Sequence, residues 1–249
     1  MRIVFDIDGT LTDYSSFLKE TAYPFFQRKY QMAVVFPDCL EPEDIFDMNH
    51  FFQEKYQCTS EEVRYYTKRA LDDFWVSFRF VKYALLNRFR FGVRECFTHL
   101  RKEKHIIEIY TSRAKSCETG LLGILSRTLT IIQFYRNGII LFTRKIHFFG
   151  SDKEKVAAIT AAGADLVFED KPEVIESLVS QGIKCVCVSG SHNQSLTENE
   201  SIRKLENFSP ETLNDTMVSK PKSILFRFIL QNKNQRGKQL FREVITQNP

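Results

Sequence analysis

The apolar residues of the chain follow two different patterns in its two main parts. Between about residues 92 and 190, short apolar runs typical of buried strands alternate with longer stretches typical of helices. Between about residues 14 and 90 that alternation is absent, and the pattern is helical with breaks at Pro24 and Pro37. One further apolar run, at residues 3–5, precedes the helical part. The pattern therefore predicts an α/β core into which a helical segment is inserted.

Five short apolar runs define the strands that we expect in this core. They lie at residues 3–5, 106–110, 145–149, 164–168 and 183–188. Helical stretches separate them, at about residues 92–103, at about 117–136 and after Ser151. Strands joined by helices form parallel sheets covered on both faces, so the expected fold class is α/β with a doubly wound parallel sheet. The carboxyl ends of such strands share one edge, where ligands bind.

Two acidic residues follow the first of these runs. Asp6 stands where the strand should end, and Asp8 comes two residues later, so both carboxylates lie on the same side of the chain. Gly9 is suited to the turn because it tolerates backbone angles that are closed to other residues. Two acids crowded at a strand end repel each other and lose hydration, which is costly unless a cation or a proton offsets it. We therefore expect a functional site here.

The stretch Asp6-Ile7-Asp8-Gly9-Thr10 resembles the DxDGT signature of the haloacid dehalogenase (HAD) superfamily, whose members are mostly magnesium-dependent phosphohydrolases. The resemblance implies that Asp6 attacks phosphorus and becomes an aspartyl phosphate. Asp8 would protonate the leaving oxygen and then deprotonate the water that hydrolyses this intermediate. The chemistry of the residues agrees, because a carboxylate can serve as a covalent nucleophile and its neighbour can hold a proton. Gly9 would lie next to the substrate.

The resemblance also implies a division into domains. Residues 1–13 and 91–205 would form the HAD-like catalytic core. Residues 14–90, which are inserted directly after the first motif, would form a helical cap over the site. Residues 206–249 would form a separate basic segment.

Three polar residues follow the second core strand. Thr111 matches the second motif of the superfamily, a Ser or Thr that hydrogen-bonds the phosphoryl oxygens. Ser112 and Arg113 come next and are candidates for binding the substrate, although a surface arginine is an equal alternative for Arg113. A hydroxyl group at a strand end is common in turns, so the pattern alone is not specific.

A lysine near the third core strand matches the third motif. Ser151 and Glu154 have the spacing of a capping box, which places Lys153 in the first turn of the next helix. A lysine is unfavourable at the positive end of a helix unless a bound dianion reverses the local charge. Lys155 should point away, because it lies two residues further round the helix. We therefore take Lys153 as the catalytic candidate.

Two adjacent acids follow the fourth core strand, Glu169 and Asp170. They resemble the fourth motif, which completes a Mg²⁺ site with Asp6 and the main-chain carbonyl of Asp8. The usual first residue is Asp, and Glu169 is one methylene longer, whereas Mg²⁺ demands near-ideal octahedral geometry. Which acid binds the metal directly stays open; we favour Glu169 through one oxygen, with Asp170 holding a bound water.

Composition limits the function classes only broadly. The 249 residues are 43% hydrophobic and 27% charged, as in globular proteins, and the net charge of +4 does not indicate a nucleic acid polymer as partner. No signal peptide precedes Arg2 and no apolar run approaches transmembrane length. The six cysteines lack the spacing of a metal site and are typical of reduced thiols. We expect a protein of the cytosol, or an effector secreted into a host cytosol.

The C-terminal segment is strongly basic. Residues 220–249 contain seven lysines and arginines and one acid, Glu243, and apolar residues gather at 224–230. Such a segment can bind peripherally to an anionic membrane. Equally open are a solvated helix packed on the domain and a linker to a further domain.

Three functions stay open at this point. The first, which we favour, is a phosphatase acting on phosphotyrosine in proteins, because aromatic residues between 65 and 89 would suit an aromatic leaving group and the composition resembles that of secreted bacterial effectors. The second is a phosphatase of small phosphomonoesters, nucleotides first, because residues 150–153 and 168–171 are similar to HAD-type 5′-nucleotidases. The third is a non-catalytic, membrane-associated adaptor.

Overall fold

The computed structural model describes residues 1–13, 89–206 and six single positions, which are 17, 59, 61, 65, 87 and 208. The predicted cap (14–90) and the predicted basic segment (206–249) therefore lie almost entirely outside the described residues, and both stay predictions. Among the described residues, no helix is long and apolar enough to cross a membrane.

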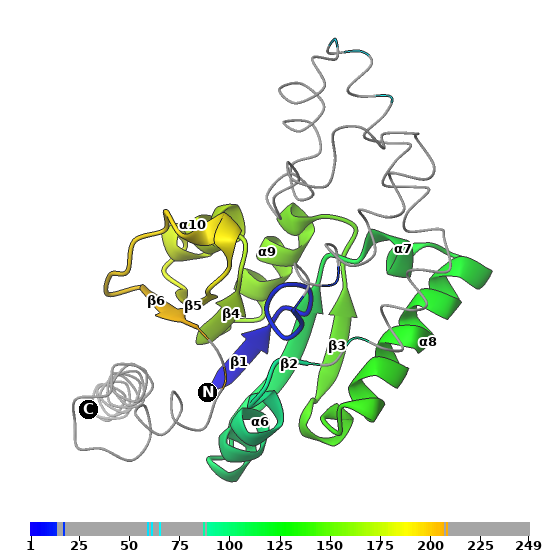
Figure 1. The fold of residues 1–249 in the computed structure, drawn as a ribbon, viewed down its shortest axis with the longest axis horizontal. Coiled ribbons are helices and arrows are strands. Elements are labelled where there is room, and N and C mark those ends of the chain that lie inside the picture. The colour runs from blue at the N-terminus through cyan, green and yellow to red at the C-terminus, as the bar shows by residue number, and fades with distance from the viewer. Residues whose placement is uncertain are drawn as a thin grey trace, which may run out of the picture.

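The core is a six-stranded sheet in which every strand pairs in parallel with its neighbours, in the order β3-β2-β1-β4-β5-β6 (Figure 1). The strands are β1 (Arg2–Phe5), β2 (Ile106–Thr111), β3 (Lys145–Phe148), β4 (Leu166–Glu169), β5 (Lys184–Val188) and β6 (Ile202–Leu205). This confirms the expected α/β class and the parallel sheet. The sixth strand was not expected, because its sequence Ile-Arg-Lys-Leu has no apolar run.

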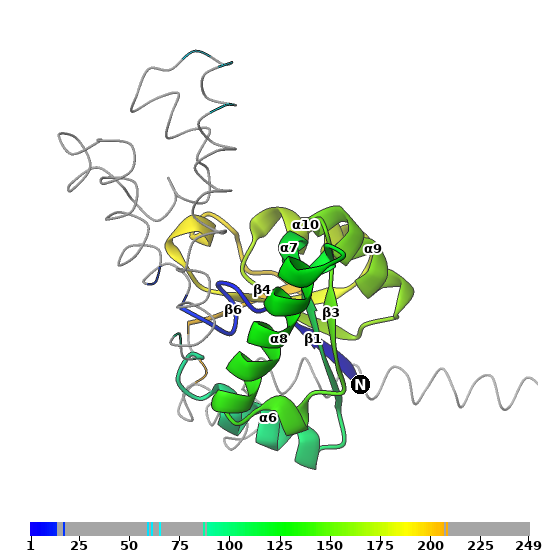
Figure 2. The same cartoon turned by 90° about the vertical axis from the view of Figure 1, so that its right-hand side faces the viewer.

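Helices cover both faces of the sheet. The described helices are α6 (Val93–Lys102), α7 (Ala114–Cys117), α8 (Leu121–Arg136), α9 (Asp152–Ala161) and α10 (Pro172–Ser180), with short 3₁₀ turns η2 (Ile140–Phe142) and η3 (Ser191–Asn193). Apolar side chains of α6 pack on one face, and those of α9 and α10 pack on the other. α8 lies along the β3 side of the sheet, where Figure 2 shows it in front of the strands. The sheet is therefore doubly wound, as predicted.

Alternation along each strand divides the core into two layers. Ile3 and Phe5 of β1 point to the α6 side, and Val4 between them points to the side of α9 and α10. The ring of Phe5 stacks on Phe168 of β4 at 4.3 Å and meets Phe97 of α6 at 4.7 Å. These aromatic contacts join the central strands to α6.

The helix expected at 117–136 is shorter than its sequence suggested. It begins at Leu121, because Gly120 has a φ of +97° and separates α7 from α8. It ends as expected at Asn137 and Gly138, where the glycine has a φ of +69°.

The strand register brings three polar strand ends to one edge. Phe5 pairs with Ile109 on one side and with Phe168 on the other. The residues that follow these positions, among them Asp6 and Glu169, therefore emerge from the sheet close together. This is the arrangement from which the site is built.

We predict that Phe97→Ala lowers the free energy of unfolding by about 3–5 kcal/mol, because the side chain is fully buried against Phe5. The control is Phe91→Ala, whose side chain is 75% exposed; we expect a change within about 0.5 kcal/mol. Urea denaturation of the two variants measures both values. Equal losses would contradict the assignment of Phe97 to the core.

Candidate active site

Asp6 is buried at the end of β1, where only 5% of the residue is exposed. Its backbone N–H donates to the carbonyl of Phe168 at 3.0 Å, which holds the start of the loop against β4. Burial raises the pKa of its carboxyl well above the usual value; Lys155 acts in the opposite direction, while Glu169, Asp170 and Asp8 raise the pKa further. A carboxyl in this environment needs positive charge to stay ionised.

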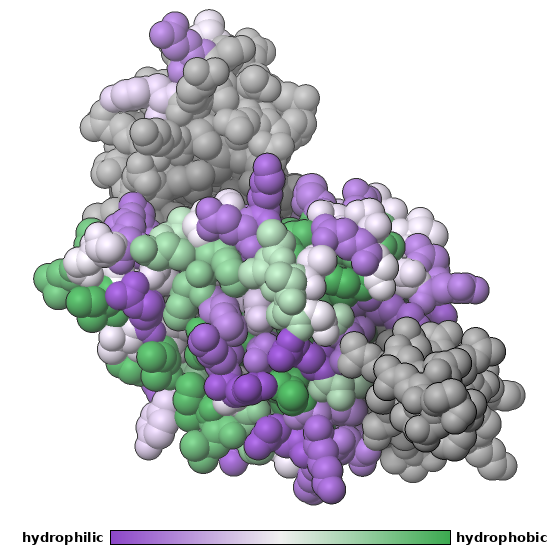
Figure 3. All heavy atoms as spheres, turned by 180° about the vertical axis from the view of Figure 1, so that it is seen from behind, coloured by the Kyte–Doolittle hydropathy of each residue, from purple (hydrophilic) through white to green (hydrophobic). Residues whose placement is uncertain are grey.

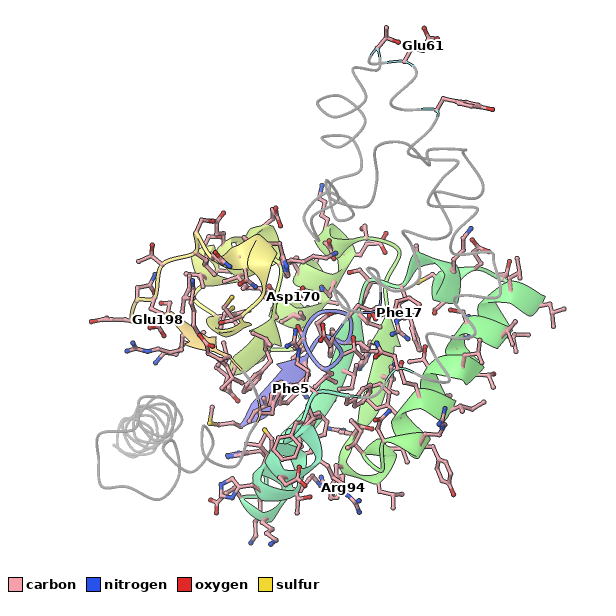
Figure 4. The ribbon with its side chains drawn as sticks, in the orientation of Figure 1. Phe5, Phe17, Glu61, Arg94, Asp170 and Glu198 are labelled. Carbon is pink, nitrogen blue, oxygen red and sulfur yellow. The ribbon has the colours of Figure 1, made fainter. Side chains whose placement is uncertain are left out.

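Two more carboxylates lie beside Asp6. Oxygen atoms of Asp6, Glu169 and Asp170 all lie within 4.8 Å of one another, and all three residues are buried. Figure 4 shows Asp170 next to the loop that follows β1. The structure therefore confirms that the acids predicted at two separate strand ends converge.

A buried lysine joins two of these acids. The Nζ of Lys155 donates to Glu169 Oε2 at 2.8 Å and to Asp6 Oδ1 at 3.1 Å, and it lies 3.6 Å from Asp152 Oδ1. Burial acts to lower the pKa of Lys155, but the carboxylates of Asp6, Glu169 and Asp152 outweigh it and hold the pKa well above the usual value. The carboxylates therefore favour the charged form of Lys155.

The expectation that Lys153 faces the site and Lys155 points away is wrong. Lys153 is exposed, whereas only 1% of Lys155 is. The hydroxyl of Ser151 caps the helix by accepting from the N–H of Glu154, so the start of α9 was predicted correctly and its buried side was not. Residues two apart lie on nearly opposite sides of a helix. The buried stripe of Val156 and Ile159 continues back to Lys155, and this spacing was the signal for the correct lysine.

Gly9 serves Asp170. Its φ of +89° disfavours any side chain, and a Cβ there would lie 2.0 Å from Asp170 Oδ2. The hydroxyl of Thr10 donates to Asp170 Oδ1 at 3.1 Å. The loop after β1 thus encloses this carboxylate; the predicted contact of Gly9 with a substrate stays a prediction.

The segment after β5 supplies two residues that the sequence analysis missed. His192 Nε2 lies 3.1 Å from the carbonyl oxygen of Asp170 and 3.0 Å from its Oδ2. The amide of Asn193 donates to the carbonyls of Asp170 at 2.8 Å and Val188 at 2.9 Å. The pair begins four residues after the end of β5, and no motif in the sequence marked it. These contacts fix the backbone of Asp170.

Glu169 and Asp170 differ in how their oxygens are used. Glu169 Oε1 accepts from the backbone N–H groups of Asp170 at 3.2 Å and Lys171 at 3.3 Å, and its Oε2 accepts from Lys155. Asp170 Oδ2 is buried and accepts no hydrogen bond from the described residues that meets normal geometry. Buried carboxylate oxygens of this kind are the ligands that hard divalent cations prefer. The donor set therefore fits a metal such as Mg²⁺.

Asp8 is held by Arg113. Its Oδ2 accepts from Arg113 Nε at 2.8 Å and its Oδ1 from Nη2 at 2.7 Å, a two-pronged contact. The same guanidinium, which is buried, donates to Thr130 at 2.8 Å and Gln133 at 3.3 Å on α8. Arg113 is thus a buried residue that binds Asp8. Its predicted contact with substrate, and the predicted metal contact of the Asp8 carbonyl, stay predictions.

The remaining motif residues lie at the same edge. Thr111 is the last residue of β2 and is buried, and Ser112 follows it directly. Their predicted hydrogen bonds to phosphoryl oxygens stay predictions. At the outer side of the acids, Lys171 Nζ lies 2.9 Å from Asp152 Oδ2. Burial acts to raise the pKa of Asp152. The positive charges of Lys171 and Lys155 outweigh burial and lower this pKa to about 2.

Comparison with known proteins finds similar chains that cover most of the sequence. No protein-family model matches the chain. A candidate nucleotidase from Bacillus cereus is 26% identical over 198 residues, which cover 79% of this chain and 90% of that protein. A candidate phosphatase from Clostridium difficile aligns with a TM-score of 0.56 at 14% identity, over 87% of this chain and 97% of that one. A candidate HAD hydrolase from Bacillus subtilis, in a magnesium-bound structure, gives 0.52 at 13% identity, over 86% and 96%.

The chain has the fold of the HAD superfamily. This agrees with the resemblance carried by Asp6-Ile7-Asp8-Gly9-Thr10, and the converging acids occupy the edge of the HAD-like sheet where that resemblance expected them.

We predict that Lys155→Met lowers the free energy of unfolding by about 3–5 kcal/mol at pH 8, measured with a chelator present, because it leaves Asp6 and Glu169 buried without their cation. The pKa of both carboxyls is already raised and would rise further. A carboxyl with a higher pKa in the folded state destabilises the fold above its unfolded pKa, so the loss should grow from pH 5 to pH 8.

Lys153→Met is the matched control, because Lys153 is an exposed lysine of the same helical turn. We expect its free energy of unfolding to stay within about 0.5 kcal/mol of the original at both pH values. A loss of the same size in both variants, or a Lys155→Met loss that does not change with pH, would contradict the role of Lys155.

Proposed function

We propose that the chain hydrolyses phosphomonoesters with Asp6 as the nucleophile and a divalent cation as cofactor. One observation carries the proposal: Asp6, Glu169 and Asp170 converge with Lys155 at the carboxyl edge of a HAD-type sheet. A non-catalytic adaptor is less well supported, because burying several charges costs stability that a scaffold would have no reason to give up.

The charge of the cluster supports a divalent cation. Three buried carboxylates face one ammonium group, which leaves an excess of two negative charges when all are ionised. We propose that Asp6 and Asp170 hold Mg²⁺ together with the carbonyl of Asp8. When bound, the ion would stabilise negative charge on the phosphoryl oxygens. We favour Asp170 over Glu169 as the direct ligand, because the oxygens of Glu169 accept three hydrogen bonds, from Lys155 and two backbone N–H groups, whereas those of Asp170 are contacted by Thr10 and His192.

The residues of the chain account for the two chemical steps. A carboxylate oxygen of Asp6 forms a bond to phosphorus while the bond to the ester oxygen breaks, and that oxygen leaves with a proton from Asp8. In the second step Asp8 takes a proton from water, whose oxygen replaces that of Asp6 at phosphorus. Lys155 keeps Asp6 ionised for the attack, and Thr111 and Ser112 would bind the phosphoryl oxygens. Arg113 contacts both oxygens of Asp8, and each oxygen keeps a second lone pair for the proton that is transferred.

Small phosphomonoesters, nucleoside monophosphates first, are the substrate class that we favour. The relative from Bacillus cereus is named as a candidate nucleotidase, and it is similar over most of both chains. The preference for phosphotyrosine depended on aromatic residues between 65 and 89, most of which lie outside the described residues. It therefore remains the second candidate.

We predict that Asp6→Asn lowers kcat for an aryl phosphate by about 10³-fold or more, because an amide cannot attack phosphorus. Glu95→Gln is the control, since Glu95 is an exposed acid on α6, and it should leave kcat unchanged. Removing divalent cations with a chelator should abolish turnover, and adding Mg²⁺ should restore it. Activity that survives either treatment would refute the proposed mechanism.

A substrate panel separates the two substrate classes. We predict that kcat/KM for the best nucleoside monophosphate exceeds that for phosphotyrosine peptides by about tenfold or more, which corresponds to about 1.4 kcal/mol of transition-state stabilisation. The reverse order would favour the protein phosphatase, and would leave the roles of Asp6 and the cation intact.

A further inference from the structure

Helix α8 has an unusual distribution of polar and apolar residues for a surface helix. Its inner side is mostly small or polar, formed by Gly123, Ser126, Thr130 and Gln133 beside two apolar residues, Leu129 and Phe134. Its outer side is apolar. The exposed apolar residues are Leu121 (80%), Leu122, Ile124, Leu125, Ile131 and Tyr135 (74%), and Thr128 and Arg136 are the exposed polar ones. A surface helix normally has the opposite arrangement.

The polar residues on the inner side of α8 are explained by their contacts with residues of the candidate active site. Thr130 and Gln133 accept from Arg113, which holds Asp8, and Ser126 lies 2.6 Å from the hydroxyl of Ser116 in α7. Within residues 1–13 and 89–206, no contact of this kind explains the outer side. Figure 3, which views the molecule from behind, shows hydrophobic surface along the side on which α8 lies. A continuous apolar stripe of this kind is rare on a monomer and marks an interaction surface.

We propose that α8 packs antiparallel against α8 of a second copy of the chain, so that the protein is a two-fold symmetric dimer. The contact surface, here called the α8 seam, consists of Leu121, Ile124, Thr128, Ile131 and Tyr135.

The spacing of the α8 seam is that of a helix–helix contact. Its members are separated by three, four, three and four residues, which places them on one side of the helix. Thr128 lies at the centre, seven residues from each end of the α8 seam. In an antiparallel pair centred there, Thr128 would face its own copy and Leu121 would face Tyr135, while Ile124 would face Ile132 and Ile131 would face Leu125. Each apolar residue therefore meets an apolar residue, as a two-fold contact requires.

Charge favours the antiparallel direction. Arg136 is exposed at the end of α8, and Glu118 is exposed just before its start. Pairing about Thr128 would bring Arg136 opposite position 120 of the second copy, two residues from Glu118. A parallel pair would instead place the two Arg136 side chains side by side. Antiparallel packing also sets the helix dipoles against each other in the favourable sense.

A second copy fits this surface better than a membrane does. A helix that lies on a membrane typically has lysines and arginines on its polar face. α8 contains two basic residues, Arg127 and Arg136. The guanidinium of Arg127 is already bound to the carbonyl of Ser116 at 2.5 Å. A seam of 16 residues is about 24 Å long, so the contact is modest and we expect a dissociation constant on the order of micromolar.

Sedimentation velocity of the full chain between about 1 and 100 µM tests the dimer, with the mass rising from that of the monomer towards twice that value. Ile131→Glu should raise the dissociation constant by about 100-fold, because it removes apolar contact and places a charge in the seam twice in each dimer. Ala157→Glu, which adds the same charge at an exposed position of α9, is the control and should leave it unchanged. A monomer at every concentration, or a dimer that Ile131→Glu does not weaken, would overturn the proposal.

Cross-linking tests the direction. Thr128→Cys should form a disulfide between copies under mild oxidation, because residues that face each other across closely packed helices come within bonding distance. Lys102→Cys, an exposed position on α6, is the control and should not. Since Cys117 is also exposed, peptide mass mapping must identify the linked residue. A dimer in solution without linkage at position 128 would overturn the antiparallel arrangement.

Discussion

The candidate site depends on the contacts of the buried Lys155 ammonium group with Asp6 and Glu169. Three carboxylates from the ends of two strands lie within 4.8 Å of one another, and such a cluster would unfold or take up protons without a cation. Lys155 contacts Asp6 and Glu169 directly and is held in place by α9. It offsets one negative charge and leaves two, which suits a divalent cation beside a phosphate group. The same contacts thus stabilise the fold and, in the mechanism that we propose, prepare Asp6 for attack.

The candidate site also affects which residues of helix α8 are buried and which are exposed. Asp8 needs Arg113, and Arg113 needs oxygen acceptors, which α8 supplies through Thr130 and Gln133. The inner side of α8 is therefore committed to polar contacts. Most of the exposed residues of α8 are apolar, and this is the face that we propose packs against a second copy of the chain.

The sequence was sufficient for the features that depend on strand ends. Parallel strands bring their carboxyl ends together in any such sheet, so Asp6, Glu169 and Asp170 could be placed without knowing the packing. It was insufficient where the answer depended on which side of an element is buried. The expectation for Lys153 used the charge of the helix end and ignored the stripe of Val156 and Ile159. The contacts of His192 with Asp170 join segments 22 residues apart and have no local signal.

The extra methylene of Glu169 explains why Glu169 and Asp170 have different hydrogen-bond partners. An aspartate at this position would be shorter and would reach less far towards both the backbone and Lys155. The longer side chain receives the N–H groups of the next two residues on one oxygen and Lys155 on the other. Both oxygens are then occupied in shaping the turn after β4 and in fixing the lysine. Asp170 is enclosed by Gly9 and Thr10, and its Oδ2 lies 3.0 Å from His192 Nε2. It is the acid that we propose as the direct ligand of the ion.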